Sequence, residues 1–515
     1  MRILIATHFP LPGHGGVDTY IHGLEKGLTR RGHEVEILAP HATLPRICLF
    51  RNGNYVEKAS IEPLVNRKIR DFFRLYFTSY TVNTTIQKAE SHGAIVENPA
   101  FESISLMRSL ELQRYYLEIA ALYFGLQDYD LIHTQDVVSS LALARVKPAH
   151  IPLVVTLHGY FEEELRIQDR ISENNHIQRE YVKLLEQSGI SASDISITPS
   201  NWLKNQMLQN HNFRHLQFAV IPSGIDVSDF HNRLNEVPQL IFDSDQKNLI
   251  CPARLDAVKG HHDLLNALAK LKQERQDWLC WFVGDGPLRQ QLERRCKDLG
   301  LSSYVKFTGA RGDVPSLLKQ ADVMVLASLQ ENLPFAVMEA QLAGKPVVVT
   351  NAGGMPEMVS HEQTGLVCDV HDSDSLYLNL KCMLDDEELR RRTGRNSQKF
   401  AYTQWSLEAM MHRIHVVYED ALRKKREQID PTNAAGVVQT LSRGDWKLSH
   451  EESNHSRDRF RYVLAKTYER LFRNELPPST IRLDRSVWDR VLQHAPSTYS
   501  LPDALVLQAL SQVMR

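Results

Sequence analysis

The sequence predicts an α/β protein in which two doubly wound domains face a cleft and a small helical appendage follows them. The chain has 515 residues, too many for one hydrophobic core, so we expect at least two domains. Hydrophobic residues make up 43% and charged residues 24%, an ordinary globular composition. Short apolar runs alternate with helical patterns in two separate regions, and this alternation favours two parallel sheets covered by helices.

The first domain is predicted over residues 1–222. The apolar run Arg2–Thr7 predicts a buried strand, and a loop rich in Gly and Pro follows it. Val17–Arg31 has the pattern of a helix, and Glu34–Ala39 predicts the next strand. This order is typical of the start of a doubly wound domain. Residues 45–127 interrupt the alternation, and we expect a helical insertion there.

The second domain is predicted over residues 223–405. Its expected strands are rich in Val and lack alternation, as parallel strands buried on both faces do. They are Leu249–Cys251, Trp281–Val283, Val305–Phe307, Val323–Leu326 and Val347–Val349. We expect residues 406–428 to form a helix that packs back on the first domain, and residues 429–515 to form a linker and a helical appendage.

Charge and cysteine content restrict the class of protein. The net charge of −2 lacks the basic excess of nucleic-acid binders, so no nucleic-acid partner is expected. The six cysteines show no paired CxxC spacing, which favours free thiols in a reducing compartment. No signal peptide begins the sequence, and no run reaches the ~20 apolar residues that span a bilayer. We therefore expect a cytoplasmic protein.

The most informative motif is Glu331-Asn-Leu-Pro-Phe-Ala-Val-Met-Glu339, at the start of a predicted helix. A loop that leads into a helix offers free backbone N–H groups to a diphosphate. Carboxylates beside it can accept hydrogen bonds from ribose and sugar hydroxyls. By itself the motif also fits two glutamates on a solvated helix face. A Gly-Lys-Pro segment before a Val-rich strand and a turn, Gly353-Gly354-Met-Pro-Glu357, come next.

This block resembles the signature of the retaining glycosyltransferases of the GT-B fold, specifically glycosyltransferase family 4. The resemblance covers about residues 1–425. It implies two Rossmann-like domains around a cleft and transfer of a sugar from a nucleotide-sugar to an acceptor. Arg254 and Lys259 match the family's Arg and Lys pair, whose charges would stabilise the departing diphosphate. Glu331 would then orient the sugar, and Glu339 would hold the ribose.

The resemblance implies further site residues. His158, after the strand Leu153–Thr156, matches a histidine that lies near the reacting sugar carbon. Pro334 lacks the backbone N–H that many relatives direct at the donor. The remaining residues expected to contact the donor are Gly15, Gly16, Gly284, Asp285, Gly309, Val314, Leu333 and Phe335.

The resemblance favours a UDP- or GDP-sugar as donor and implies no cofactor and no metal. Asp243-Ser-Asp245 and Asp372-Ser-Asp374 have the Asp-x-Asp form, but we interpret both as turns, and His261-His262 as structural. Arg67–Tyr76 mixes cations and aromatic residues, which fits either peripheral membrane contact or an ordinary helix face. The acceptor and the oligomeric state are left open. The alternatives are a catalytically inactive GT-B partner subunit and a phosphorylase- or epimerase-like enzyme.

Overall fold

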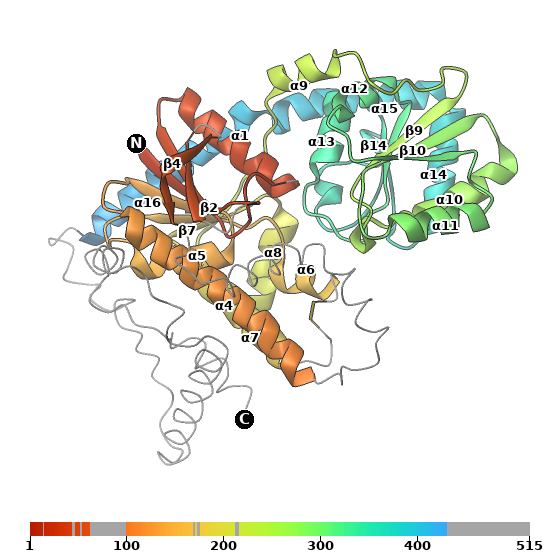
Figure 1. Ribbon diagram of the computed structural model, residues 1–515. Helices are drawn as coiled ribbons and strands as arrows, with labels where there is room; N and C mark the ends of the chain where they lie inside the picture. The colour runs from red at the N-terminus through yellow and green to blue at the C-terminus, as the bar shows by residue number, and fades with distance from the viewer. Residues whose placement is uncertain are drawn as a thin grey trace.

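The computed structural model describes residues 1–13, 15–43, 47–51, 54–61, 99–167, 170–171, 176–211 and 216–429. These residues form two sheets, one mainly and one wholly parallel, each with helices on both faces, and the two domains lie side by side (Figure 1). The predicted class, two Rossmann-like domains in a GT-B arrangement, is confirmed. The Arg67–Tyr76 segment lies outside the described residues, as does the appendage expected after residue 429.

The N-terminal domain contains an eight-stranded sheet with the order β4-β3-β2-β1-β5-β6-β7-β8. Its strands are β1 (Arg2–Ala6), β2 (Glu34–Pro40), β3 (Ile47–Arg51), β4 (Asn54–Ile61), β5 (Leu131–Thr134), β6 (Leu153–Thr156), β7 (Ile195–Thr198) and β8 (Phe218–Val220). The helices around it are α1 (Gly16–Arg30), α4 (Pro99–Phe124), α5 (Val137–Val146), α6 (Phe161–Ile167), α7 (His176–Ser191) and α8 (Asn201–His211). β1 is apolar throughout its buried part because helices cover both faces of the sheet.

The expected helical insertion at residues 45–127 instead begins with two strands. β2 pairs with β3 and β3 pairs with β4, both antiparallel, so the hairpin extends the parallel sheet at its edge. Within the same stretch, the helix α4 covers Pro99–Phe124. The sequence Asn52-Gly53 between two runs of strand-forming residues is a common signal for a two-residue hairpin loop, and it could have predicted this pair of strands.

The C-terminal domain contains a six-stranded parallel sheet with the order β11-β10-β9-β12-β13-β14. Its strands are β9 (Lys247–Pro252), β10 (Trp278–Val283), β11 (Val305–Gly309), β12 (Val323–Leu326), β13 (Val347–Thr350) and β14 (Gly365–Cys368). Its helices are α9 (Val227–Leu234), α10 (His261–Glu274), α11 (Arg289–Asp298), α12 (Val314–Gln320), α13 (Phe335–Leu342), α14 (Ser373–Asp385) and α15 (Glu387–Gln404), with short 3₁₀ turns η1 (Ala257–Lys259) and η2 (Met355–Glu357). Separate hydrophobic clusters fill the two faces of this sheet.

The helix α16 (Leu407–Ile429), the last of the described elements, returns to the N-terminal domain, where Figure 1 shows it in blue against the sheet. Its apolar face, including Met410, Ile414 and Tyr418, belongs to the same buried cluster as β1. Within residues 216–429 the chain therefore crosses between the domains twice. The two crossings are hydrogen-bonded to each other, because the Ile225 N–H donates to the Trp405 carbonyl at 2.7 Å and the Leu407 N–H to the Ile225 carbonyl at 2.8 Å.

Candidate active site

The two sheets each have one position where the strand order reverses, and ligands of such sheets bind there, beyond the carboxyl ends of the strands. In the C-terminal domain the reversal lies between β9 and β12. Lys259 follows β9 and Glu331 follows β12, and their side chains form an ion pair. The Ser328 hydroxyl also donates to the Glu331 carboxylate, at 3.0 Å. Two of the predicted site residues thus meet where the topology favours a ligand.

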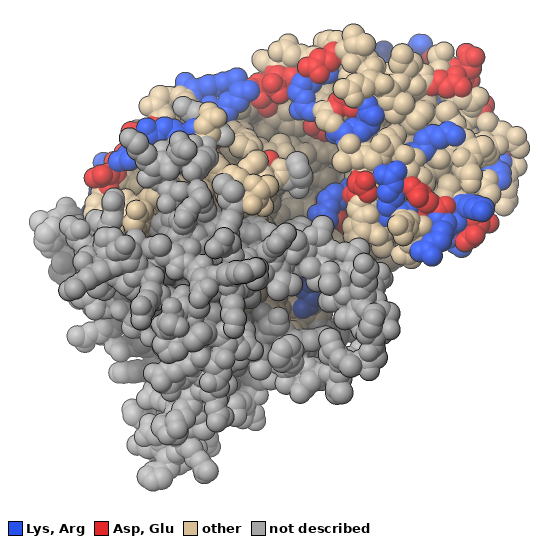
Figure 2. Space-filling model, in the orientation of Figure 1, with Lys and Arg blue, Asp and Glu red and all other residues tan. Residues whose placement is uncertain are grey.

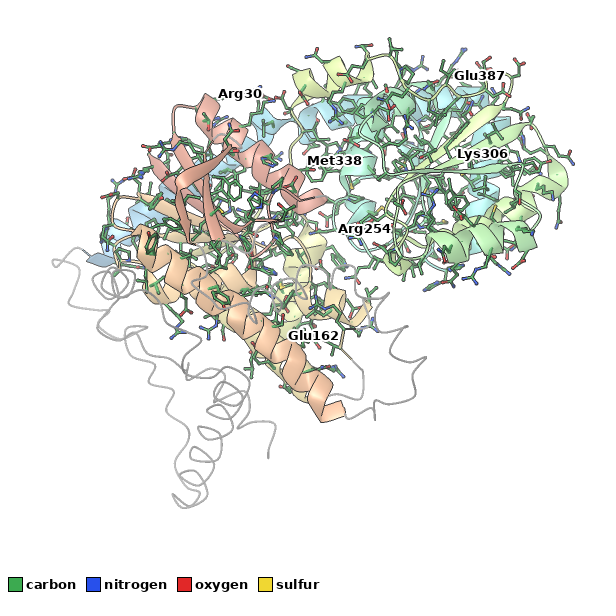
Figure 3. All side chains as sticks on the ribbon, viewed as in Figure 1. Arg30, Glu162, Arg254, Lys306, Met338 and Glu387 are labelled. Carbon is green, nitrogen blue, oxygen red and sulfur yellow. The ribbon has the colours of Figure 1, made fainter. Side chains whose placement is uncertain are left out.

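Two cations stand at this position. Burial disfavours the charged form of Lys259, but the charge of Glu331 and its hydrogen bond outweigh this effect and raise the pKa of the lysine. Lys259 is therefore cationic at neutral pH. The Arg254 side chain is 54% exposed, and its guanidinium lies 3.5 Å from an Asp256 carboxylate oxygen. Figure 3 shows Arg254 on the side of its domain that faces the N-terminal domain. Both cations can reach an incoming anion.

Glu339 lies within α13, one turn from its N-terminus, and is half-buried. Burial raises the pKa of its carboxyl group to about 7, and the weaker attraction of Arg233 opposes this rise. Within the described part of the chain, no side chain caps the N-terminus of α13, which begins after Pro334. The first N–H groups of this helix are therefore available to an anion.

The predicted residues on β10 to α12 lie at the same edge of the sheet. Gly284 and Asp285 follow β10, Gly309 ends β11, and Val314 begins α12. The Asp285 carboxylate accepts hydrogen bonds from the Gly286 N–H at 2.8 Å and from Arg289 at 3.0 Å, so its side chain already has protein partners.

The side chains of the two remaining predicted residues of the C-terminal domain, Leu333 and Phe335, pack against hydrophobic clusters. Leu333 is 7% exposed and belongs to the core of that domain. Phe335 contacts the hydrophobic clusters of both domains. A Cβ atom added to Gly16 would lie 3.5 Å from the Phe335 ring, so the two predicted residues approach each other across the domain boundary. Gly15 precedes α1 with a φ of 148°. These residues can reach a donor chiefly through their backbones.

His158 lies in the N-terminal domain, just after β6, and its side chain is fixed by neighbouring residues. Its Nε2 donates to Gln135 Oε1 at 3.1 Å, and its ring meets Tyr20 edge-on at 4.7 Å between centroids. Gln135 follows β5, where the strand order of the N-terminal sheet reverses. Burial lowers the pKa of His158 to about 4, and Asp136 opposes this shift only weakly. The imidazole is therefore neutral at pH 7, with Nδ1 as its hydrogen-bond acceptor.

Sequence reasoning did not single out Glu164 on α6. A Cβ atom added to Gly159 would lie 1.6 Å from Glu164 Oε1, so this carboxylate covers the glycine next to His158. Glu164 is exposed, yet the protein groups around its carboxyl group and the charge of Glu186 raise its pKa to about 7. Lys259 opposes this rise, and Glu331 adds to it. Glu164 thus faces the Lys259–Glu331 pair from the opposite domain. Its signal in the sequence is a run of three glutamates directly after His158-Gly159-Tyr160-Phe161.

The two Asp-x-Asp strings form local backbone contacts. Asp243 accepts a hydrogen bond from the Asp245 N–H at 3.0 Å. Asp372 caps α14 by accepting from the N–H groups of Asp374 and Ser375. His261 is buried, with its ring edge-on to Phe282. Among the described residues, no three His, Cys, Asp or Glu side chains are grouped to hold a metal ion. The metal-free site remains a prediction.

Figure 2 shows that the surface is recessed where the charged surface of the C-terminal domain meets the N-terminal domain. Among the helices described above, none has the length and apolar character needed to cross a bilayer.

Comparison with known proteins gives matches over both domains. The family model described as glycosyl transferases group 1 matches residues 232–400, and the model described as glycosyltransferase family 4 matches residues 14–229. A protein of Methanocaldococcus jannaschii named as an uncharacterized glycosyltransferase is 26% identical over 434 residues, covering 82% of this chain and 99% of that relative. The N-acetyl-alpha-D-glucosaminyl L-malate synthase of Bacillus anthracis is 24% identical over 437 residues, covering 82% and 98%.

Solved structures share the fold over the same part of the chain. Sucrose-phosphate synthase from Thermosynechococcus elongatus has a TM-score of 0.61 at 18% identity, covering 82% of this chain and 99% of its own. HepE from Anabaena, in complex with UDP, has a TM-score of 0.57 at 21% identity, covering 82% and 100%. Since two family models together span both domains, the chain belongs to glycosyltransferase family 4 and is a GT-B glycosyltransferase.

Proposed function

We propose that this glycosyltransferase takes its sugar from a nucleotide-sugar donor bound at the carboxyl ends of the C-terminal sheet, and that it retains the anomeric configuration. The observation that carries the proposal is the meeting of Lys259 and Glu331 at the position where the strand order reverses. In the free protein these groups neutralise each other. A diphosphate would compete for the lysine and release the carboxylate to accept hydrogen bonds from sugar hydroxyls.

The charges of the site fit a departing diphosphate. Arg254 and Lys259 would stabilise the negative charge that develops as the glycosidic bond breaks, assisted by the free N–H groups of α13. We expect these groups to act without a metal. The Glu339 carboxylate would accept hydrogen bonds from the ribose hydroxyls. His158 is neutral and hydrogen-bonded to Gln135. It would lie beside the anomeric carbon, where its Nδ1 would accept a hydrogen bond from a sugar hydroxyl.

UDP-sugars are the donors to test first, because the fold neighbour HepE from Anabaena has been solved with UDP and with UDP-glucose. GDP-sugars come next. The acceptor would approach from the N-terminal domain, where His158 and Glu164 face the donor site.

The test measures release of nucleoside diphosphate from UDP-, GDP-, ADP- and dTDP-sugars, with and without EDTA. Wild type is compared with Glu331→Ala and Arg254→Ala, and with Arg391→Ala as a control, since Arg391 is 66% exposed on α15. We expect one donor to be turned over by wild type and the control, and by neither site variant. Turnover that persists in Glu331→Ala would overturn the assigned site.

Two further results would replace the proposal. If calorimetry shows that wild type binds none of the four nucleoside diphosphates, a non-catalytic partner subunit becomes the better description. If turnover requires inorganic phosphate or changes the donor sugar itself, the enzyme is phosphorylase- or epimerase-like. Proton NMR of the first product anomer decides retention, because a product of inverted configuration contradicts it.

A further inference from the structure

Asn332 is the first of two residues that join the domains across the candidate site. It follows Glu331 directly in the loop after β12. Its Nδ2 donates a hydrogen bond to the backbone carbonyl of His158 at 3.0 Å, and its Oδ1 accepts one from the Ser200 hydroxyl. One short loop of the C-terminal domain therefore carries both Glu331, which is proposed to bind the sugar, and Asn332, which is hydrogen-bonded to the backbone of His158.

Glu357 is the second. It ends η2, in the loop after β13, and its carboxylate accepts hydrogen bonds from the Asn201 N–H at 2.9 Å, from Asn201 Nδ2 at 3.1 Å and from the Trp202 N–H at 2.6 Å. These N–H groups begin α8 of the N-terminal domain, and the first N–H groups of a helix have no partner within it. A carboxylate of one domain thus caps a helix of the other, in the position that the helix dipole favours for a negative charge.

The loops that carry these two residues are fixed to each other. The Gly354 N–H donates to the Glu331 carbonyl at 3.0 Å. A Cβ atom on Gly353, whose φ is 55°, would lie 1.9 Å from the Glu331 carbonyl oxygen, and one on Gly354 would lie 2.3 Å from that of Asn332. Neither glycine tolerates a side chain without a shift of the loop. Movement of one loop therefore moves the other, and both move Glu331.

We propose that Asn332 and Glu357 are positioning residues that bring Glu331 into register with His158 only when the two domains are closed. The proposal rests on the proposed function for the roles of Glu331 and His158. Neither Asn332 nor Glu357 is assigned to the donor, since their side chains form hydrogen bonds with groups of the N-terminal domain. When the domains separate, these bonds break together and the site is divided into two halves.

The proposal predicts a specific pattern of kinetic effects. Asn332→Ala and Glu357→Gln leave the cations and carboxylates of the donor site intact, so donor affinity should stay within about twofold of wild type. The turnover number should fall by about ten- to a hundredfold, as expected when reacting groups lose their alignment. Glu357→Asp, which keeps the charge, should recover part of that loss. Glu387→Gln is the matched control, because Glu387 lies at the far end of the C-terminal domain in Figure 3.

A distance measurement tests closure without turnover. Among the described cysteines only Cys382 is exposed, and Asp128 of the N-terminal domain has an 84% exposed side chain. Spin labels at Cys382 and Asp128→Cys report the separation of the domains in pulsed electron resonance. We expect a longer and broader distance distribution for Asn332→Ala and Glu357→Gln than for wild type and Glu387→Gln, with UDP or without it.

The outcomes separate this proposal from the donor assignment. Unchanged distances and unchanged turnover in both variants would overturn the positioning role. A donor affinity more than about tenfold weaker at unchanged saturated turnover would also overturn it, and would make these residues donor ligands. If wild type binds no nucleotide at all, the proposed function fails, yet the distances measured without ligand still decide whether Asn332 and Glu357 hold the domains closed.

Discussion

Replacing Glu339 by glutamine measures how much stability the ligand-free protein loses by holding a charged carboxylate within α13. Burial raises the pKa of this group from its ordinary 4.5 to about 7. One pKa unit corresponds to about 1.4 kcal/mol, so the ionised carboxylate destabilises the folded protein by up to about 3 kcal/mol. Glutamine keeps the shape and carries no charge. Glu339→Gln should therefore raise the free energy of unfolding at pH 8.

The sign of the pH dependence follows from the direction of the shift. The folded protein binds the Glu339 proton more tightly than the unfolded chain, so the contribution of this group to stability is complete below about pH 4.5 and is lost as the pH rises through about 7. The stability gained by Glu339→Gln should grow over this window and stay constant above about pH 8.

The assay is urea unfolding of wild type and Glu339→Gln at several pH values between about 4.5 and 8.5. Glu388→Gln, whose side chain is 72% exposed, serves as the control and should show no such trend. A gain that does not change with pH would refute the reasoning. The same variant should bind the donor about five- to thirtyfold more weakly at pH 8, because a neutral amide accepts ribose hydrogen bonds less strongly.

Two further predictions concern residues away from direct chemistry. Gly353 has a φ of 55° and no room for a Cβ atom, so Gly353→Ala should lower the free energy of unfolding in urea by about 1–3 kcal/mol and remove most donor turnover. The control Gly312→Ala, with open space around it, should resemble wild type in both assays. Tyr418→Phe should lower the free energy of unfolding by about 1–3 kcal/mol in thermal or urea unfolding, because it removes the 2.7 Å hydrogen bond to the fully buried His133. Wild-type stability in this variant would show that the hydrogen bond does not stabilise the protein.

The strands of the C-terminal domain could be predicted because burial on both faces leaves a continuous apolar signal. Val323–Leu326 and Val347–Thr350 were found within one residue of their ends for this reason. β14 (Gly365–Cys368) was missed, since it is short and follows a polar turn. The hairpin of β3 and β4 was missed because an edge hairpin breaks the parallel rhythm on which the domain was recognised.

The candidate site could be predicted only in part. Lys259 and Glu331 were chosen from separate motifs, and the strand order explains why they meet. Asn332 and Glu357 stand inside recognised motifs, yet the partners of Asn332 lie 132 and 174 residues away, and those of Glu357 lie 155–156 residues away, all in the other domain. No local pattern encodes the relative position of two domains. Contacts of this kind are therefore visible only in three dimensions.

The return of α16 to the N-terminal domain has a consequence for the order of folding during synthesis. Residues of α16 complete the hydrophobic cluster around β1, so the first domain is built from two separate stretches of chain, with the C-terminal domain inserted between them. On the ribosome, the N-terminal sheet would emerge first but keep an uncovered apolar face until residues 407–429 had been made. The inserted domain, continuous in sequence, would be the first able to complete its core. A nascent chain arrested before α16 would thus be the form most in need of a chaperone.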